Sequence, residues 1–370
     1  MVPIFGNKFY GPLFGSLENA GLIKDQTYFI FGYDFRKSVQ TSASWLNDFL
    51  ENEVLLRNPG KKINIASHRM GGLVARYCVE KIVGCSGKID KIVTGGTPHW
   101  GLNDAYQFWA GLEAHSSDFL INFGEKFILR LVRNYQSDPV THMQTNFPGV
   151  RDLLPVVQYI YNKPYASLHP IDKNLTIEQL FDFSAQFISS VRTLSGTKIN
   201  TDSLFVVKDP NQNEQSKGLW LDGKPTRTYA GEGDDTVLIT SSEIPASSAK
   251  YYAKLHHSDY FRDRRSIKDT LEWFNLSSII PSPLTTNTPV LIMVFSPNIQ
   301  LQSSPGLQSG GPQAAFIDNP NKKFKVKFTG RSSGNYLVET FIFAYGQEQE
   351  RQFSGSIGQG EEKEIDLQND

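Results

Sequence analysis

One segment limits the possible folds of this chain more than any other. Residues 63–76 read INIASHRMGGLVAR, an apolar run that meets a Gly-containing turn and continues as a helical pattern. Strand, sharp turn and helix form the context of a nucleophile elbow, whose central residue is strained and needs small residues two positions before and after it. Arg69 satisfies this rule with Ser67 and Gly71, whereas Ser67 would be flanked by Ile65 and Arg69. The elbow register therefore places Arg69 at the centre.

Strand-like and helical patterns alternate around this segment. We expect strands at Thr27–Phe31, Lys62–Ala66 and Lys91–Thr94, and later strands at Ser203–Val207 and Lys250–Leu255. Helices are expected between them at residues 11–20, 38–58, 71–82 and 259–275. This alternation is typical of right-handed βαβ units and a parallel sheet, so the predicted fold class is α/β. The alternative without a function is that the Gly-containing turn at residues 67–72 is an ordinary connection between a strand and a helix.

The residue at the elbow centre decides the chemistry. A Ser there attacks an acyl carbonyl while a His takes its proton, and backbone N–H groups at the start of the next helix hold the oxyanion. Arg69 cannot attack in this way, because its guanidinium stays protonated and has no lone pair to offer. The N–H of Met70 stays the candidate oxyanion donor.

The acid and the base of such a site follow in that order, each in a loop after a later strand. Asp234 lies in the sequence GDDTV, where a neighbouring Gly lets its carboxylate turn toward an imidazole. His256 and His257 follow the expected strand Lys250–Leu255, and we assign the base to His257 with His256 as the alternative. The alternatives without a function are that Asp234 lies in a solvated acidic turn and that the His is an ordinary surface residue.

These residues resemble the lecithin:cholesterol acyltransferase and lysosomal-phospholipase-like family of α/β-hydrolases. Five blocks over about residues 8–275 carry the resemblance: YDFR (33–36) for Y-D-W-R, SHRMGG (67–72) for G-H-S-M-G-G, GTPHWG (96–101) for G-T-P-H-x-G, FPGVRDLLP (147–155) for P-S-x-x-x-L-L-P, and GDDTV (233–237) for G-D-G-T-V. The resemblance implies acyl transfer or ester hydrolysis on lipids by a Ser-Asp-His triad, matched by position 69, Asp234 and His257. It implies no metal and no organic cofactor.

Three departures from the family pattern stand out. Arg69 replaces the Ser and Asp235 replaces a Gly. The chain also begins just before the first crossover helix, where the family has its opening strands and a loop that donates half of the oxyanion hole. We therefore expect an N-terminally incomplete chain whose strand Thr27–Phe31 is an exposed edge of the sheet.

The matching blocks also predict a pocket. Asp34 and Arg36 are expected to brace one another at its wall, and His99 to line it without a direct part in the chemistry. The residues assigned to this pocket are Tyr33, Asp34, Arg36, His68, His99 and Trp100.

The chain divides into an α/β-hydrolase domain at residues 1–275, a Ser-, Thr- and Pro-rich linker at 276–288 and a domain at 289–370. The first includes a cap insertion at about 104–200, helical in period and rich in aromatics. We expect these aromatics to face lipid, including a membrane surface, and the alternative is that they pack as plain core. In the domain at 289–370, apolar residues recur at every second position, which predicts an all-β sandwich.

Composition excludes some partners and compartments. The 370 residues carry a net charge of −1, and Lys and Arg are scattered, so nucleic acid is excluded as a partner. Cys78 and Cys85 lie seven apart in one expected helix, about 10 Å along its axis, so both are expected to be free. The sequence has no signal peptide and no run that spans a bilayer; it leans toward a secreted or cell-envelope protein and leaves the oligomeric state open.

The predicted function is that of a lipid acyl-ester hydrolase or O-acyltransferase, inactive as written because of Arg69, so that its status as an enzyme stays open. The first hypothesis is that the protein is an esterase or acyltransferase and that Arg69 is a recent substitution or a sequence error, because Ser and Arg codons can differ by one base. Reading codon 69 in independent copies of the gene tests this hypothesis, and a reproducible Arg would exclude a sequence error. A second hypothesis is a non-catalytic protein whose Arg69 holds an acyl carboxylate or phosphate. A third places the function in the C-terminal domain, where no ligand cluster is recognisable.

Overall fold

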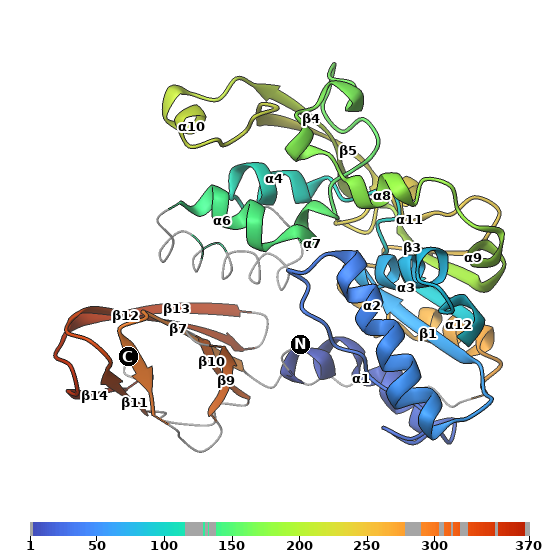
Figure 1. Cartoon of the computed structure of the whole chain (residues 1–370), viewed down its shortest axis with the longest axis horizontal. Coiled ribbons are helices and arrows are strands. Elements are labelled where there is room, and N and C mark those ends of the chain that lie inside the picture. Colours follow the sequence, from blue (N-terminus) through green and yellow to red (C-terminus); the bar gives the residue numbers. More distant parts are fainter. Residues whose placement is uncertain are drawn as a thin grey trace. The chain divides into compact units, whose positions relative to one another are not determined.

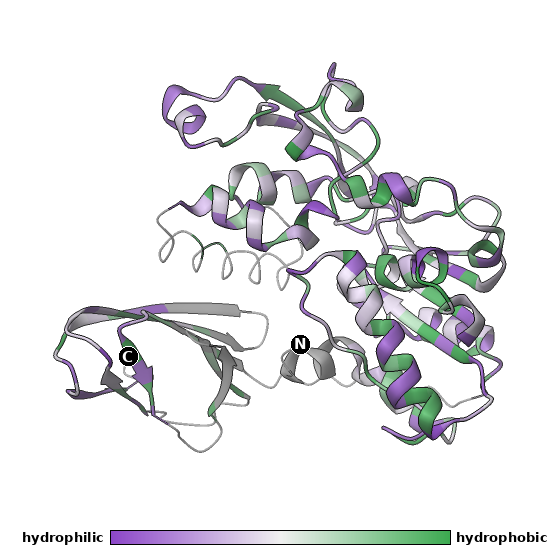
Figure 2. Ribbon diagram, in the orientation of Figure 1, coloured by the Kyte–Doolittle hydropathy of each residue, from purple (hydrophilic) through white to green (hydrophobic). Residues whose placement is uncertain are grey.

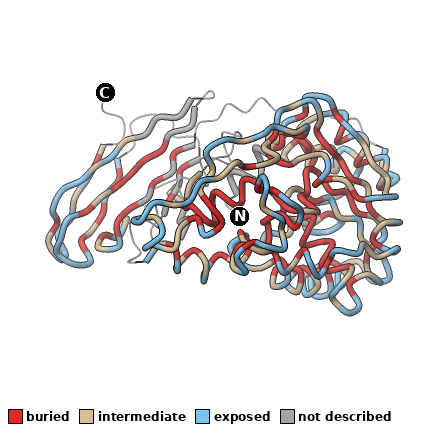
Figure 3. The backbone as a smooth tube through the Cα atoms, turned by 90° about the horizontal axis from the view of Figure 1, so that it is seen from above, coloured by how far each residue is buried: buried red, intermediate tan, exposed pale blue. Residues whose placement is uncertain are grey.

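The computed structural model describes residues 3–114, 129, 132, 138–277, 290–302, 307–311, 314–318, 325–344 and 347–366. Contacts divide the chain into two compact units, Phe9–Pro283 and Leu284–Asp370, the second together with Val2–Lys8. Buried residues lie within each of the two units (Figure 3). Within the described part of the chain, no helix has the length and apolar character to cross a membrane.

A parallel sheet of four strands forms the centre of the first unit (Figure 1). Its strands pair in the order β1-β2-β3-β6, and every pair is parallel. The α/β class and the α/β-hydrolase architecture are therefore confirmed. The strand bounds are β1 (Ile63–His68), β2 (Ile89–Gly95), β3 (Val191–Thr197) and β6 (Ser248–Ala253).

Helices with one apolar face accompany this sheet. In the second helix, Val39, Ala43 and Leu46 are buried at spacings of four and three, and apolar and polar residues alternate along it (Figure 2). Its start is fixed by Ser38, whose hydroxyl accepts a hydrogen bond from the N–H of Thr41. The helices are α1 (Pro3–Asn19), α2 (Val39–Phe49) with its π-helical continuation η1 (Leu50–Leu55), α3 (Met70–Lys81), η2 (Ser86–Lys88), α9 (Ala185–Ser190), α11 (Ile239–Ser242), η5 (His257–Asp259) and α12 (Arg264–Trp273).

Short helices lie between β2 and β3, where the cap was expected. The block 147–155 anchors them, because Asp152 accepts a hydrogen bond from the N–H of Val39 at 2.7 Å and another from the hydroxyl of Thr176 at 2.6 Å. Asn174 adds two bonds from its amide to the carbonyl oxygens of Asp152 and Leu154. The described elements are α4 (Asp104–Gly111), α6 (Pro139–Asn146), α7 (Pro148–Arg151), η3 (Tyr165–Ser167), η4 (Pro170–Asp172) and α8 (Leu175–Gln179).

Strand β3 was not predicted, although it lies at the centre of the sheet and inside the range 104–200 expected for the cap. Its sequence, VRTLSGT, is polar for a strand with neighbours on both sides. Tertiary partners engage two of its polar side chains: the hydroxyl of Ser195 lies 2.8 Å from that of Ser242, and Arg192 stacks over the ring of Trp273. Local periodicity could not reveal a strand whose polar side chains find their partners on other elements.

The predicted strand at Ser203–Val207 exists but belongs to a different sheet. It is part of β4 (Ile199–Lys208), which pairs antiparallel with β5 (Lys224–Gly233). The connection between them contains α10 (Gln212–Ser216), with a capping box formed by Asn211 and Glu214. This hairpin ends at Gly233, directly before the candidate acid.

The prediction of a strand at Thr27–Phe31 is wrong. Among the described residues, its only ladder contact is an isolated bridge between Lys24 and Tyr28, and the N–H groups of Thr27 and Tyr28 bond to the carbonyl oxygen of Ile23 in a local turn. Asp25 has a φ of 58°, which an extended strand does not allow. This segment belongs to none of the sheets that the described residues form, so it is not an edge of the parallel sheet.

The prediction that the two cysteines are free is also wrong, because Cys78 and Cys85 form a disulfide with a Cα–Cα distance of 5.6 Å. The expectation assumed one helix through both residues. Instead α3 ends at Lys81, and the chain reverses through Gly84, which has a φ of 80°. The turn brings Cys85 back beside the last turn of α3, where both side chains are buried.

The described residues between 290 and 366 form two antiparallel sheets. One antiparallel sheet has the order β13-β12-β7-β10-β9 and the other β14-β11-β8. Side chains of both sheets, among them Met293, Val338 and Phe328, form one buried apolar core. The strands are β7 (Val290–Phe295), β8 (Ile299–Leu301), β9 (Leu307–Gly311), β10 (Ala314–Asp318), β11 (Lys325–Gly330), β12 (Gly334–Ala344), β13 (Gln347–Ile357) and β14 (Glu362–Asp366).

Candidate active site

Arg69 occupies a strained turn between β1 and α3. Its φ of 52° and ψ of −130° lie in a region that non-glycine residues rarely adopt. The N–H of Arg69 donates to the carbonyl oxygen of Gly95 at 3.0 Å, which ties the turn to the end of β2. Ser67 is buried and donates its hydroxyl to the carbonyl oxygen of Val93 at 2.9 Å. Ser67 is therefore engaged in the sheet, and the elbow register is centred on Arg69.

Close packing at this turn demands glycine at position 72 more than at position 71. A Cβ on Gly72 would lie 2.1 Å from the hydroxyl oxygen of Thr97, whereas a Cβ on Gly71 would make only ordinary contacts with Tyr33 and Ser67. The start of α3 thus rests directly on the turn that follows β2. Met70 is the first residue of α3, so its N–H has no acceptor within the helix, which is the property an oxyanion donor needs.

Asp234 and His257 meet at the carboxyl end of the sheet. Nδ1 of His257 lies 2.9 Å from Oδ2 of Asp234, and both side chains are buried. The second carboxylate oxygen accepts hydrogen bonds from the N–H groups of Val237 at 2.6 Å and Thr236 at 3.1 Å. Burial alone would raise the pKa of Asp234, but the charge and hydrogen bond of His257, with the N–H of Val237, hold that pKa below its usual value.

Tyr260 completes the surroundings of this carboxylate. Its hydroxyl donates to Oδ2 of Asp234 at 2.8 Å and accepts from the N–H of Gly196 at 2.7 Å. Gly96 closes the other side, because a Cβ there would lie 2.9 Å from Oδ2 of Asp234 and 3.0 Å from Cε1 of His257. Gly96 stood in a recognised sequence block, but no sequence signal pointed to Tyr260.

His256 lies in a different environment from His257. Its Nδ1 is bonded to Oδ2 of Asp235, and its side chain is 56% exposed, compared with 0% for His257. Burial raises the pKa of Asp235, and the bond from His256 opposes that shift. Asp235 thus takes part in a second, more exposed pair, and the structure brings only His257 to Asp234.

His68 lies beside the ring of His257, with 4.8 Å between the ring centroids. Its Nε2 lies 2.8 Å from the carbonyl oxygen of His257, and its Nδ1 lies 3.1 Å from the hydroxyl of Tyr10 on α1. His68 was expected to line a pocket. Its two ring nitrogens are instead engaged inside the protein, and Tyr10 had not been singled out.

The other residues assigned to the pocket divide into two groups. Arg36 donates from Nε and Nη2 to the carboxylate of Asp34 at 2.8 and 2.7 Å, the expected mutual bracing, and Tyr33 lies near the elbow at Gly71. His99 is buried in the core with its ring edge-on to Phe187, and burial lowers the pKa of His99. Trp100 packs edge-on against Phe181 and Phe183. The structure therefore does not gather all six residues around the Asp234–His257 pair.

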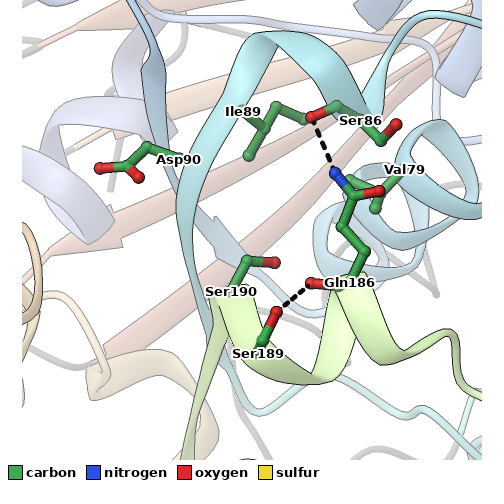
Figure 4. A pocket seen from close by; sticks show the side chains of 7 residues that line it. All are labelled: Val79, Ser86, Ile89, Asp90, Gln186, Ser189 and Ser190. Atoms are coloured by element: carbon green, nitrogen blue, oxygen red, sulfur yellow. Dashed lines mark hydrogen bonds between the residues drawn. The ribbon is translucent and has the colours of Figure 1, made fainter.

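A separate pocket of about 220 Å³ lies at the opposite end of the sheet (Figure 4). It adjoins the amino ends of β2 and β3, whereas ligands of open α/β sheets bind beyond the carboxyl ends. Gln186 crosses it and donates from its amide to the carbonyl oxygen of Ser86 at 3.2 Å. The lining residues are Val79, Ser86, Ile89, Asp90, Gln186, Ser189 and Ser190. Among the described residues, no cluster of three or more His, Cys, Asp or Glu side chains could hold a metal ion.

Comparison with solved structures gives distant similarities. The lipase BlEst2 of Bacillus licheniformis in its propeptide form is 12% identical, with a TM-score of 0.39, 91% of this chain covered and 88% of that chain. Phospholipase PlaB of Legionella pneumophila is also 12% identical, with a TM-score of 0.37 and coverage of 95% and 87%. A chain of the Tle4–Tli4 complex is 16% identical, with a TM-score of 0.46 and coverage of 66% and 67%.

A search of curated protein sequences returned no match. The model of the family described as lecithin:cholesterol acyltransferase matches residues 4–263, which include β1 to β6, the elbow and the Asp234–His257 pair. Because this match covers more than half of the chain, the protein belongs to the lecithin:cholesterol acyltransferase family.

Proposed function

We propose that this protein is a lipid acyl-ester hydrolase-like or O-acyltransferase-like member of its family that retains an acid and a base but lacks triad-dependent esterase activity. The observation that carries the proposal is the backbone of Arg69, whose φ of 52° and ψ of −130° mark the centre of the elbow. The side chain at that centre would have to be the nucleophile, and a guanidinium has no lone pair to offer.

Asp234 and His257 are the proposed acid and base. In a serine hydrolase the buried carboxylate holds the imidazole with its Nδ1–H toward the acid, and Nε2 takes the proton of the attacking hydroxyl. Here Nδ1 of His257 faces Asp234, and Nε2 is buried without a partner among the described residues. The pair could therefore receive a proton, but position 69 has no hydroxyl to supply it.

The expected loss of activity is large. Removing the nucleophile of a well-studied serine hydrolase lowers kcat by about 10⁶-fold, and the oxyanion hole with substrate binding leaves about 10³–10⁴-fold over the reaction in water. We therefore expect no turnover of lipid esters that depends on His257.

The test compares three proteins in a short-chain nitrophenyl ester assay with fluorophosphonate labelling: the natural chain, Arg69→Ser, and Arg69→Ser with His257→Ala. The natural chain should show neither labelling nor turnover above background. Labelling of the natural chain would contradict the proposal. If Arg69→Ser is labelled and the label persists undiminished after His257→Ala, the base has been assigned wrongly and His256 is the next residue to replace.

A second candidate function is the binding of an acyl ligand without catalysis. The observation that favours it is a permanent cation, Arg69, held next to the first N–H of α3, since both groups suit a carboxylate or phosphate. Binding of fatty acid and of lysophospholipid to the natural chain and to Arg69→Ala, measured by isothermal titration calorimetry, separates the two functions. Equal affinities of the two proteins would exclude this role for Arg69.

A further inference from the structure

We propose that Tyr10 and His68 act as positioning residues that hold His257 in the orientation of a general base. This inference rests on the proposed function only in taking His257 as the base. In this proposal His68 supports His257 from inside the protein and does not line a pocket. Tyr10, which is distant from both residues in the sequence, contributes its hydroxyl to the site.

The partners of His68 determine its tautomer. The carbonyl oxygen of His257 can only accept a hydrogen bond, so Nε2 of His68, 2.8 Å away, must carry the proton. In the neutral ring Nδ1 is then an acceptor, and the Tyr10 hydroxyl at 3.1 Å must donate to it. Proton donation therefore runs in one direction, from Tyr10 to His68 and from His68 to the backbone of His257.

Burial keeps Tyr10 and His68 in the protonation states that this series of hydrogen bonds requires. Burial, assisted by the nearby charges of His257 and Arg69, lowers the pKa of His68 to about 3. Burial also raises the pKa of Tyr10 to about 12, against an opposing effect of Arg69. Between these limits His68 stays a neutral donor at Nε2, and Tyr10 keeps the proton that it donates.

The backbone N–H, the carbonyl oxygen and Nδ1 of His257 are consequently all engaged. Its backbone N–H donates to the carbonyl oxygen of Asp234 at 2.9 Å, its carbonyl accepts from His68, and its Nδ1 faces the carboxylate of Asp234. Only Nε2 has no partner among the described residues, and it is the atom that a general base uses. His68 cannot itself take a proton from a substrate through a nitrogen that is already engaged, so it is a positioning residue and not a catalytic one.

The test uses the natural chain of 370 residues with ¹⁵N-labelled histidines and reads the Nδ1–H signal of His257 by NMR, which requires no esterase activity. Variants His68→Phe, His68→Gln and Tyr10→Phe are compared. His68→Phe removes the donor to the His257 carbonyl, and His68→Gln retains an amide N–H that can replace it. Tyr106→Phe is the matched control, because Tyr106 is a buried tyrosine whose hydroxyl donates to the carbonyl oxygen of Gly223, away from His257.

We expect exchange of the His257 Nδ1 proton to be about tenfold faster in Tyr10→Phe, the factor that corresponds to the loss of one net hydrogen bond. In His68→Phe the signal should broaden beyond detection, and His68→Gln should largely restore it. Tyr106→Phe should leave the signal unchanged despite a similar loss of stability.

A folded His68→Phe protein with the natural exchange rate would overturn the inference. If that variant does not fold, Tyr10→Phe decides, because it removes a single oxygen, and an unchanged exchange rate there would overturn the inference equally. Esterase activity of the natural chain would contradict the proposed function and leave this readout intact, so the two failures are distinguishable.

Discussion

Nδ1 of His257 lies 2.9 Å from Oδ2 of Asp234, with 0% and 1% of the two side chains exposed to solvent. Water cannot screen a charge at this depth, so the carboxylate depends on its protein donors. The structure supplies them from Val237, Thr236 and Tyr260 as well as from His257. This full set of donors makes Asp234 as important for folding as for the proposed chemistry.

Asp234→Asn should lower the free energy of unfolding by about 3 kcal/mol, because its amide N–H₂ would face groups that are themselves donors. Urea denaturation measures the change. Asp209→Asn, at an exposed position, is the control and should change stability by less than about 0.5 kcal/mol. Equal effects of the two substitutions would contradict the role of the buried donors.

Gly96→Ala should destabilise the protein by more than about 2 kcal/mol. Gly96 has a φ of 53°, and a Cβ would lie 2.5 Å from Cε2 of Tyr260. Gly87→Ala is the matched control, since nothing lies within 4 Å of the Cβ that it adds. Thermal unfolding of both variants tests the expectation, and a Gly96→Ala protein with the natural Tm would show that the turn after β2 can move.

Reduction of the Cys78–Cys85 disulfide should cost about 2–3 kcal/mol, as expected for a loop closed over a sequence separation of 7. The measurement is the unfolding free energy with and without reductant, after intact mass has verified the bond. The Cys78→Ala, Cys85→Ala double variant is the control, because reductant should not change its stability. Alkylation of both cysteines in the unreduced native protein would contradict the bond itself.

Acid should destabilise the protein through His68. Burial lowers the pKa of His68 from 6.5 to about 3, so between these values the unfolded chain binds a proton that the folded chain does not. Stability therefore falls as the pH drops from about 6.5 toward 3. His68→Gln removes this contribution, and its unfolding free energy should fall less steeply over that range; parallel curves would contradict the assignment.

Asp172 should act in the opposite direction. Burial and the neighbouring carboxylate of Asp222 raise the pKa of Asp172 from 3.8 to about 8, while Lys163 partly opposes the shift. Between these values the folded state binds the extra proton, so the contribution of Asp172 is complete below about 3.8 and is lost as the pH rises through 8. Asp172→Asn should flatten the fall in Tm between pH 4 and pH 8, and an unchanged slope would contradict the expectation.

The elbow could be predicted from sequence because its requirements are local. A strand, a turn and a helix in immediate succession, with Ser67 and Gly71 around Arg69, specify one backbone conformation, and the structure has it. The order of acid and base along the chain also predicted that Asp234 and His257 would be candidates. The choice between His257 and His256 needed the structure, because adjacent residues differ in burial only through what packs around them.

The errors have a common physical cause. Thr27–Phe31 is apolar enough for a strand, but its hydrogen bonds are made in a local turn. Strand β3 is too polar to be recognised, but Ser242 and Ser248 on later elements bond to its Ser195 and Arg192 side chains. In both cases the outcome depends on which groups lie nearby in space, and periodicity carries no information about them.

The sequence by itself determined the α/β class, the elbow and the absence of a nucleophilic side chain at position 69, because each follows from residue types at short spacing. Only the tertiary structure decided that Cys78 and Cys85 are joined, that His68 contacts Tyr10 and the backbone of His257, and that Tyr260 bonds to Asp234. These contacts join residues on separate elements, and the free energy of burying their polar groups selects the partners only after the sheet has formed.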